Sequence, residues 1–287
     1  MWGSTFFAIR VGVQEVPPFL LAALRFLVAG LLLYGWTLAR GERPPSPRQW
    51  LSACLLAVLI FLVYYGGVFW AEQRVPSGIT AVLLAMTSGF MALAEIIFLR
   101  TQKLTVRLSV ALLIGLAGVA VMVNRSLDLG GVAIDMAGAI ALLVAQIGWA
   151  LSSVLARKLP QHSSDFMGSG AQMLAGGVLL LLASAALGEF RGFHPGAISA
   201  RAWLALAYLV VAGSIVAFTA YVWLIRHESP TKVGTFAYVN PVVAVLVGYF
   251  LGGEALDART VTGALCVLLS VAVIATMKAK PRETTAA

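Results

Sequence analysis

Continuous apolar segments, long enough to cross a lipid bilayer, dominate the chain. A transmembrane helix needs about 20 such residues, and apolar runs without alternation argue against barrel strands. Ten segments fit, the first of them short: 2–14, 17–39, 48–71, 77–99, 106–124, 134–156, 166–188, 201–225, 232–252 and 257–277. The sequence therefore predicts an all-α polytopic membrane protein with ten transmembrane helices.

The ten segments form two copies of one pattern. Trp2 precedes Arg10 by eight residues, and Trp149 precedes Arg157 by the same number. Each copy holds five spans, an odd number, so the second copy must be inverted relative to the first. We predict a first repeat at residues 1–127, an inverted repeat at 128–278 and a short basic tail at 279–287. Inverted repeats of this kind are typical of secondary transporters.

Composition agrees with a lipid environment. Of the 287 residues, 60% are hydrophobic and 11% charged, against about a quarter charged in soluble domains. The net charge of +8 does not indicate nucleic acid, because the basic residues lie in short loops. Cys54 and Cys266 have no neighbouring ligands, which disfavours a metal or redox site. Without a nucleotide-binding, zinc-protease or serine-hydrolase motif, we expect neither an enzyme nor a cofactor.

The first segment is short for a membrane span. Residues 2–13 rise about 18 Å as a helix, against a hydrocarbon core of about 30 Å. We expect that part of the first helix is missing from the chain, the alternative being a short helix with local bilayer thinning. We see no cleavable signal peptide, because no basic n-region precedes the apolar stretch.

Topology follows from the positions of Lys and Arg. Thirteen of them fall in one set of loops together with the C-terminal tail, and six fall in the opposite set. By the positive-inside rule, the richer side is cytoplasmic. We therefore expect a multi-pass protein of the cell (inner) membrane with both termini in the cytoplasm.

Arg25 lies inside a span, about 12 Å deep by helix rise. A charged side chain at membrane depth is costly, and is a functional-site hypothesis by default. Arg25 either contacts an anion or carboxylate in a central cavity, or is structural, bonded to helix-end carbonyls or reaching outward. Its counterpart in the second repeat is Gln172, which offers hydrogen bonds without charge.

Glu95 lies close to the cytoplasmic end of its span. It can pair with Arg100 or Lys103 at the surface. Alternatively, it can serve as a proton-coupling carboxylate, which requires a pKa raised by burial. The sequence is compatible with either role.

The span at 232–252 contains an Asn-Pro step. Pro241 removes a donor and clashes with the preceding turn, so we expect the helix to break at Asn240-Pro241 and to line a cavity there. Aromatic and amide residues of neighbouring spans suit an amphipathic solute. Our candidates for the lining of a substrate cavity are Arg25, Tyr65, Gln146, Trp149, Tyr221, Tyr238 and Asn240.

Several motifs together resemble the EamA family of the drug/metabolite transporter (DMT) superfamily. Residues 2–10, WGSTFFAIR, resemble its first-helix signature, and Pro17-Pro18 followed by Leu24-Arg25-Phe26 its second helix. Residues 240–244 and 253–256 resemble its ninth helix and the following loop. Thr87 and Gln102 depart from the proline and glutamate that family members often carry there.

The resemblance implies two inverted five-helix repeats around a central cavity, moving small metabolites without a bound cofactor. We expect a secondary active exporter of amino acids or related amphipathic compounds, working by alternating access. The alternatives are a non-transporting membrane scaffold or assembly partner, and an importer of a sugar-like metabolite. Expected partners are a small-molecule substrate and the lipid bilayer. The small-residue pairs Gly248/Gly252 and Ala111/Gly115 predict close helix packing, within one chain or in a homo-oligomer.

Overall fold

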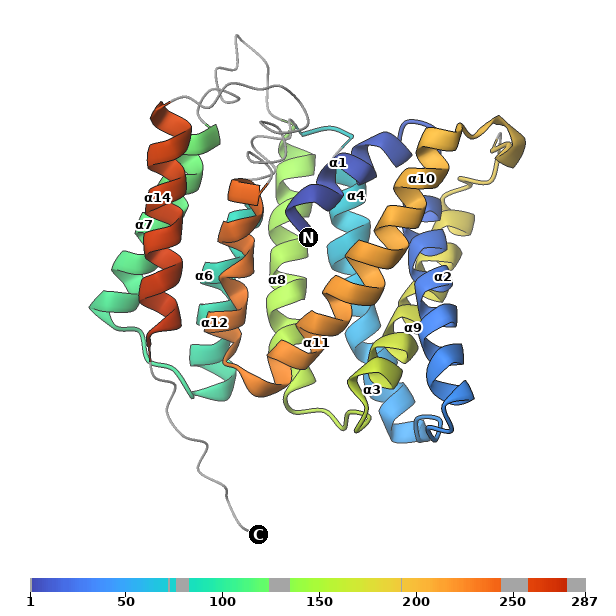
Figure 1. Cartoon of the computed structure of the whole chain (residues 1–287), viewed down its shortest axis with the longest axis horizontal. Coiled ribbons are helices and arrows are strands. Elements are labelled where there is room, and N and C mark those ends of the chain that lie inside the picture. The colour runs from blue at the N-terminus through green and yellow to red at the C-terminus, as the bar shows by residue number, and fades with distance from the viewer. Residues whose placement is uncertain are drawn as a thin grey trace.

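The computed structural model describes residues 2–71, 73–75, 83–123, 135–191, 193–243 and 258–277, and its regular elements there are helices (Figure 1). Their bounds are α1 Trp2–Gly12, α2 Pro18–Ala39, α3 Pro47–Ala57, η1 Val58–Gly66, α4 Gly67–Ala71, α6 Thr87–Ala94, η2 Glu95–Leu99, α7 Val106–Val123, α8 Met136–Ala156, α9 Asp165–Ala186, η4 Pro195–Ala197, α10 Ala200–Tyr208, η5 Leu209–Val216, α11 Ala217–His227, α12 Pro230–Gly234 and α14 Ala258–Ala275.

Five helices of the described chain are long and apolar enough to cross a membrane. Elements α3, η1 and α4 form one continuous helix, and so do α10, η5 and α11. The five membrane-length helices are therefore Pro18–Ala39, Pro47–Ala71, Met136–Ala156, Asp165–Ala186 and Ala200–His227. Shorter apolar helices occupy Leu83–Leu99, Val106–Val121 and Val261–Ala275. The prediction of a multi-pass helical membrane protein is confirmed. Parts of the predicted spans, the pair Gly248/Gly252 and the loop at 253–256 lie outside the described residues.

Short polar motifs set where the helices begin. The Ser46 side chain accepts from the Gln49 backbone N–H, and the Gln49 side chain accepts from the Ser46 N–H, before Pro47 opens α3. This reciprocal pair satisfies donors that a helix start otherwise leaves free. Serine side chains also cap three further helices, at Ser164, Ser199 and Ser229, where each accepts a single backbone N–H from the first turn.

Helices α2 and α9 pack antiparallel at one edge of the molecule (Figure 1). Glycines bring the two backbones together: a Cβ on Gly30 would lie 2.8 Å from the Leu174 nitrogen, and one on Gly170 would lie 2.9 Å from the Tyr34 nitrogen. Small residues serve this purpose in membranes, where van der Waals packing replaces the hydrophobic effect between helices.

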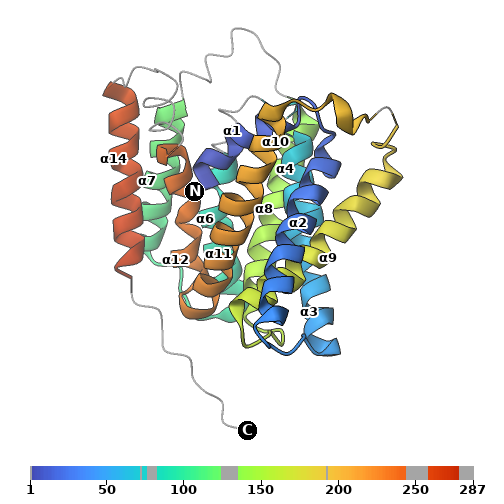
Figure 2. The ribbon, with the colours of Figure 1, turned by 45° about the vertical axis from the view of Figure 1, so that its right-hand side comes forward.

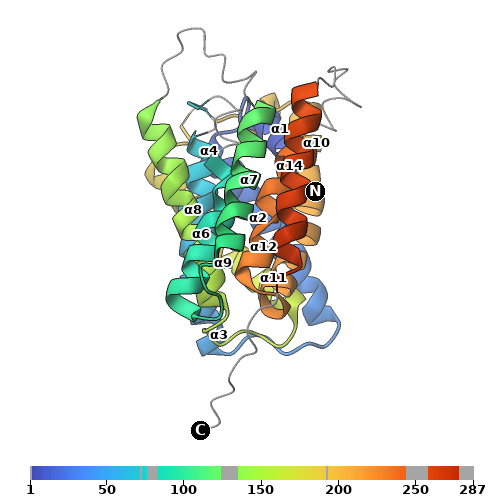
Figure 3. The same ribbon diagram turned by 90° about the vertical axis from the view of Figure 1, so that its left-hand side faces the viewer.

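Helices α7 and α14 form a second close pair at the opposite edge (Figure 3). Ser270 Oγ donates to the Ala111 carbonyl at 2.6 Å, and a Cβ on Gly115 would lie 2.7 Å from that Oγ. The small-residue pair Ala111/Gly115 therefore packs within one chain.

Between these edges, α8, α11 and the helix containing η1 stand together (Figure 2). Both η1 and η5 are π-helical and lie near the middle of their spans. A π-helical turn holds an extra residue, displaces side chains from the ordinary helical register, and is frequent at functional sites. The two segments belong to the predicted spans 48–71 and 201–225, which hold the third place in each predicted repeat.

The structure corrects the expected helix break at Asn240-Pro241. Residues 236–243 are helical, and the turn lies at Thr235, directly after α12. Proline disturbs the turn on its N-terminal side, because its ring meets the carbonyl four residues earlier and its missing N–H leaves that carbonyl free. The helix accommodates the proline, and the interruption falls about one and a half turns upstream.

Candidate functional site

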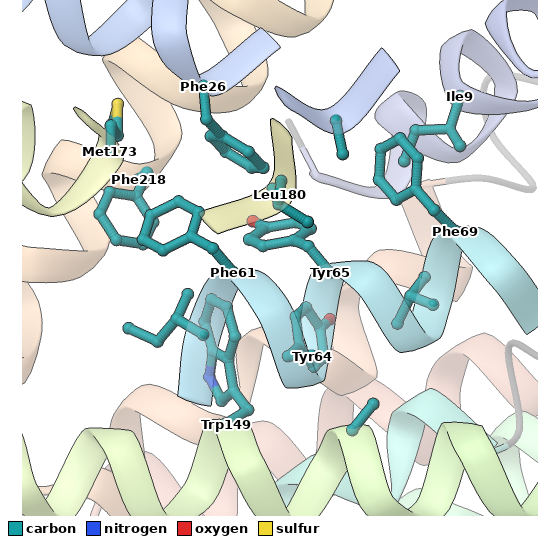
Figure 4. Close-up of a cluster of buried hydrophobic side chains, with 14 of the residues drawn as sticks. Ile9, Phe26, Phe61, Tyr64, Tyr65, Phe69, Trp149, Met173, Leu180 and Phe218 are labelled. Carbon is teal, nitrogen blue, oxygen red and sulfur yellow. The ribbon is translucent and has the colours of Figure 1, made fainter. Parts of the chain in front are cut away.

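An aromatic cage lies in the interior of the bundle. It comprises Trp2, Tyr64, Tyr65, Trp149, Tyr221 and Phe236. Ring centroids lie 4.5 Å apart for Tyr64 and Trp149, and 4.7 Å for Trp149 and Tyr221. Figure 4 shows Tyr64 extending from the η1 helix toward Trp149 on α8, and the Tyr65 ring beside Phe61 on the other side of that helix. The first three residues come from the predicted first repeat and the others from the second.

The cage encloses a cavity of about 20 Å³, which Thr5 and Asn240 also line. That volume holds about one water molecule. The aromatic side chains have therefore closed on one another, and a larger solute enters only when the helices separate. The edge-to-face and tilted ring contacts suit such a movement, because each contributes only about 1 kcal/mol beyond its buried area.

Arg25 is fully buried beside the cage. Its Nε donates to Ser214 Oγ at 2.8 Å, and its guanidinium carbon lies 4.6 Å from the centre of the Phe26 ring and 5.2 Å from that of Tyr65. A Cβ on Gly213 would meet Arg25 Nη2 at 2.7 Å, so the glycine allows the cation to approach the η5 backbone. Arg25 links α2 to η5 and lies behind the Tyr65 ring, so a solute reaches it only if that ring moves.

Gln146 and Trp149 lie one turn apart on α8, both almost fully buried. The Thr87 hydroxyl donates to the Gln146 carboxamide oxygen. The Gln146 Nε2 and Trp149 Nε1 donors have no hydrogen-bond partner among the residues described. A buried donor without an acceptor costs about 1–3 kcal/mol, which an oxygen-bearing ligand would recover.

Tyr221 forms one wall of the cage. Ser153 Oγ donates to the Trp149 carbonyl, so the Tyr221 hydroxyl, 2.6 Å from that oxygen, is the donor to it. This bond joins α8 to α11 on the buried side of the ring. Tyr238, by contrast, lies outside the cage in a separate cluster with α7 and α14, and its hydroxyl donates to the Leu112 carbonyl at 2.9 Å.

Glu95 is fully buried at the end of α6 and makes three hydrogen bonds. Its Oε2 accepts from the Thr231 N–H at 2.8 Å and the Thr231 hydroxyl at 2.7 Å, and its Oε1 accepts from the Thr101 hydroxyl at 2.8 Å. Its side chain forms no ion pair within the described part of the chain, so Arg100 and Lys103 are not the partners that the sequence suggested. Glu95 instead holds the first turn of α12.

Glu189 makes the corresponding contact at the start of α2. Its carboxylate accepts from the backbone N–H groups of Phe19 and Leu20, at 3.3 and 2.9 Å, and from Ser184 Oγ at 2.8 Å. Carboxylates at helix N-termini are stabilised by free N–H groups and by the helix dipole. Each of Glu95 and Glu189 therefore fastens a helix that belongs to the other predicted repeat.

A wider cavity of about 320 Å³ lies beside Glu189, lined also by Glu15, Arg191 and His194. The Ser199 backbone N–H and hydroxyl donate to the Glu15 carboxylate at 2.6 and 2.7 Å. The backbone hydrogen bond, and to a smaller degree the hydroxyl one, lowers the pKa of Glu15 below its usual value of 4.5.

Of the residues that the sequence singled out, five meet around one centre: Tyr65, Trp149 and Asn240 line the cavity, the Tyr221 ring packs against Trp149, and Arg25 lies behind Tyr65. Sequence reasoning missed Trp2 as a wall of the cavity, although its place in the repeat pattern had marked it. Trp2 Nε1 donates to the Gly213 carbonyl at 3.0 Å. Ser214 and Thr231 were missed as well, because single hydroxyls in apolar spans give no pattern.

These observations define a multi-pass helical membrane protein with an internal aromatic cavity. The sequence profile of the EamA-like transporter family matches residues 1–124 and 136–276. The chain belongs to this family and is a transporter rather than an enzyme, as the motif resemblance predicted.

Curated relatives and a solved structure agree with this assignment. The chain is 42% identical over 259 residues to the uncharacterized inner membrane transporter YedA of Escherichia coli K12, covering 90% of this chain and 81% of the relative. It is 26% identical over 275 residues to the WAT1-related protein At3g02690, chloroplastic, of Arabidopsis thaliana, covering 94% and 66%. One crystal structure superposes with a TM-score of 0.72 at 22% identity, covering 94% and 95% of the two chains, which shows a shared fold.

Proposed function

We propose that this protein is a secondary active transporter that exports small metabolites, amino acids or related amphipathic compounds, by alternating access. The observation that carries the proposal is the aromatic cage, built by residues of both predicted repeats around a closed cavity. A solute with an apolar body and a few oxygen atoms would satisfy the Trp149 and Gln146 donors when the cage opens. Export, rather than uptake, follows the family resemblance.

The proposed architecture is ten helices in two inverted five-helix repeats, in the inner membrane with both termini cytoplasmic. Two observations support it. The second helix of each predicted repeat, α2 and α9, pack antiparallel, and so do the fifth, α7 and α14. The third span of each predicted repeat carries a π-helical segment, η1 or η5. A homo-oligomer stays a prediction.

We further propose Glu95 as the proton-coupling residue. As an ionised carboxylate it accepts three hydrogen bonds and holds α12 against α6. A proton on the carboxyl would occupy one oxygen and weaken this contact, so that binding a proton and separating the two helices become linked. The same geometry suits a purely structural contact between α6 and α12. Flux measurements with and without a pH gradient distinguish this structural role from proton coupling.

Flux into and out of proteoliposomes tests the proposal. Purified protein is reconstituted, and a panel of amino acids and aromatic metabolites is followed with and without a pH gradient. We expect uptake above empty vesicles for at least one amphipathic compound. Trp149→Phe should change the KM for that compound, because it removes the unpartnered Nε1 donor of a side chain that is only 1% exposed in the cage. Trp203→Phe, at an exposed position on α10, serves as the matched control.

The result that would overturn the proposal is absence of flux for the whole panel with protein that is folded and correctly inserted. That outcome would favour a membrane scaffold or assembly partner. Metabolite profiling of the medium from cells with and without overexpression then tests direction, since an exporter enriches its substrate outside. Equal effects of both tryptophan variants would remove the cage from the binding role.

A further inference from the structure

A second cavity, lined by both polar and apolar side chains, lies between α8, α9 and α11. Its lining includes Ser152, Gln161, Gln172, Tyr221 and Arg226. Tyr221 lines this second cavity, and its ring also packs against the Trp2 and Trp149 rings of the cage. The Tyr221 side chain is therefore shared by the cage and the second cavity.

Gln161 and Arg226 present donors to this cavity. The Gln161 Nε2 and Arg226 Nη2 atoms are buried and have no hydrogen-bond partner among the described residues. A second atom of each side chain is engaged: Gln161 Oε1 accepts from Gln172 Nε2 at 3.4 Å, and Arg226 Nη1 lies 2.6 Å from Asp165 Oδ1. The engaged atoms fix both side chains in orientation, and each leaves N–H groups without an acceptor.

The chemistry of these donors selects an anion. An arginine N–H pair and a carboxamide N–H₂ accept nothing and match a carboxylate. Arg226 also lies against the first turn of the 22-residue helix α9, where a Cβ on Gly168 would be 3.3 Å from Nη2, and the helix dipole there favours negative charge. The acidic group paired with Arg226 is Asp165, whose charge is compensated by Arg226 Nη1.

Apolar side chains complete the wall, among them Ile60, Val222 and Ile225. We propose that this cavity is a second binding site, which takes the carboxylate of an organic anion with an apolar body. The present volume of about 10 Å³ is below that of one water molecule, so the site fills when α9 and α11 move apart. The inference rests on the proposed transport function, in which a substrate passes from this site past the Tyr221 side chain into the cage.

Ligand-induced stabilisation tests the site without requiring transport. Thermal unfolding is measured in phosphatidylcholine nanodiscs, free of competing anionic lipid, with phenylacetate or its cationic counterpart phenethylamine. At 100 times its Kd, phenylacetate should raise the midpoint by roughly 3–6 °C. Phenethylamine should give no rise. Equal shifts with the two probes would overturn the proposal.

Gln161→Glu is the decisive variant. A glutamate keeps the Oε1 acceptor for Gln172 but replaces the free N–H₂ with a second acceptor and adds a negative charge. We expect the Kd for phenylacetate to rise about tenfold or more. Gln102→Glu, the same change in the loop after η2 and outside the cavity lining, should leave the Kd unchanged.

Arg226→Lys gives a second test if Gln161→Glu does not fold. It keeps the charge near Asp165 but loses the planar fork, so the Kd should rise while the unliganded protein stays folded. A wild-type Kd in either folded variant would overturn the site. Phenylacetate binding without flux of any compound would support this site and contradict the transport proposal. Flux without preference for carboxylates would support the transport proposal and contradict this site.

Discussion

Replacing Glu95 with glutamine tests the contact between α6 and α12, because glutamine has the shape of a protonated glutamate. Its oxygen can still accept both bonds from Thr231, and the Thr101 hydroxyl can turn to accept from the new amide. Hydrogen bonds to a charged acceptor contribute about 1 kcal/mol more than neutral ones. Part of that loss across three bonds is offset because a buried charge no longer has to be desolvated. We expect Glu95→Gln to lower the free energy of unfolding by about 1–2 kcal/mol.

The assay has two readouts on the same purified protein. Thermal unfolding in detergent should show a midpoint lower by about 2–5 °C. Flux in proteoliposomes should lose its response to a pH gradient, since the variant is fixed in the state that the proton creates. Flux driven by a substrate gradient should persist.

Glu189→Gln is the matched control, because Glu189 accepts three bonds at the start of α2. In Glu189→Gln, one of the two backbone N–H groups loses its acceptor, so the free energy of unfolding should fall at least as far as in Glu95→Gln. The response of flux to a pH gradient should remain. A wild-type pH response in folded Glu95→Gln would refute proton coupling at this residue. An unchanged unfolding midpoint would refute the energetic argument.

Three further variants have defined outcomes. Gly177→Ala places a methyl 2.8 Å from a backbone nitrogen of α2 and should lower the free energy of unfolding by about 1–3 kcal/mol, measured by thermal denaturation. Gly35→Ala, with open space around it, should raise that free energy by up to about 1 kcal/mol. Tyr238→Phe removes one buried hydrogen bond, so it should cost about 1 kcal/mol and leave the KM for transport unchanged, as kinetics will show. The pKa of Glu15 is lowered in the folded protein, so its hydrogen bonds from Ser199 contribute stability above pH 4.5, and this stability is lost as the pH falls through the lowered pKa. Glu15→Gln should therefore reduce the fall of the unfolding midpoint with decreasing pH, measured between pH 3 and 6.

The helical class and most cavity residues were predictable because lipid leaves few choices. A long apolar run in a bilayer has to be a helix, and an aromatic or polar residue at mid-span has to find protein to face. Trp149, Tyr221 and Arg25 were therefore recognisable from depth and type alone. Tyr238 was not separable from them, since the sequence gives its depth but not the side of the helix that meets α7.

Two features were beyond the sequence for a different reason. The π-helical segments η1 and η5 contain ordinary apolar residues, VLIFLVYYG and LVVAGSIV, and the extra residue per turn is a consequence of packing in three dimensions. The partner of Glu95 lies 136 residues away along the chain, beyond the reach of local pattern. The nearby bases Arg100 and Lys103 were the natural candidates, and a helix start from another part of the chain takes their place.

The two carboxylate contacts also impose an order on biosynthesis. Helix α2 enters the membrane early, but the Leu20 N–H must wait for Glu189, 169 residues further along the chain. Glu95, likewise, has no Thr231 to hold until the later spans have left the ribosome. Each end of the bundle is therefore completed by residues translated long after the helix or carboxylate that they secure, and nascent chains arrested before α12 should be exposed to membrane quality-control proteases while full-length chains resist them.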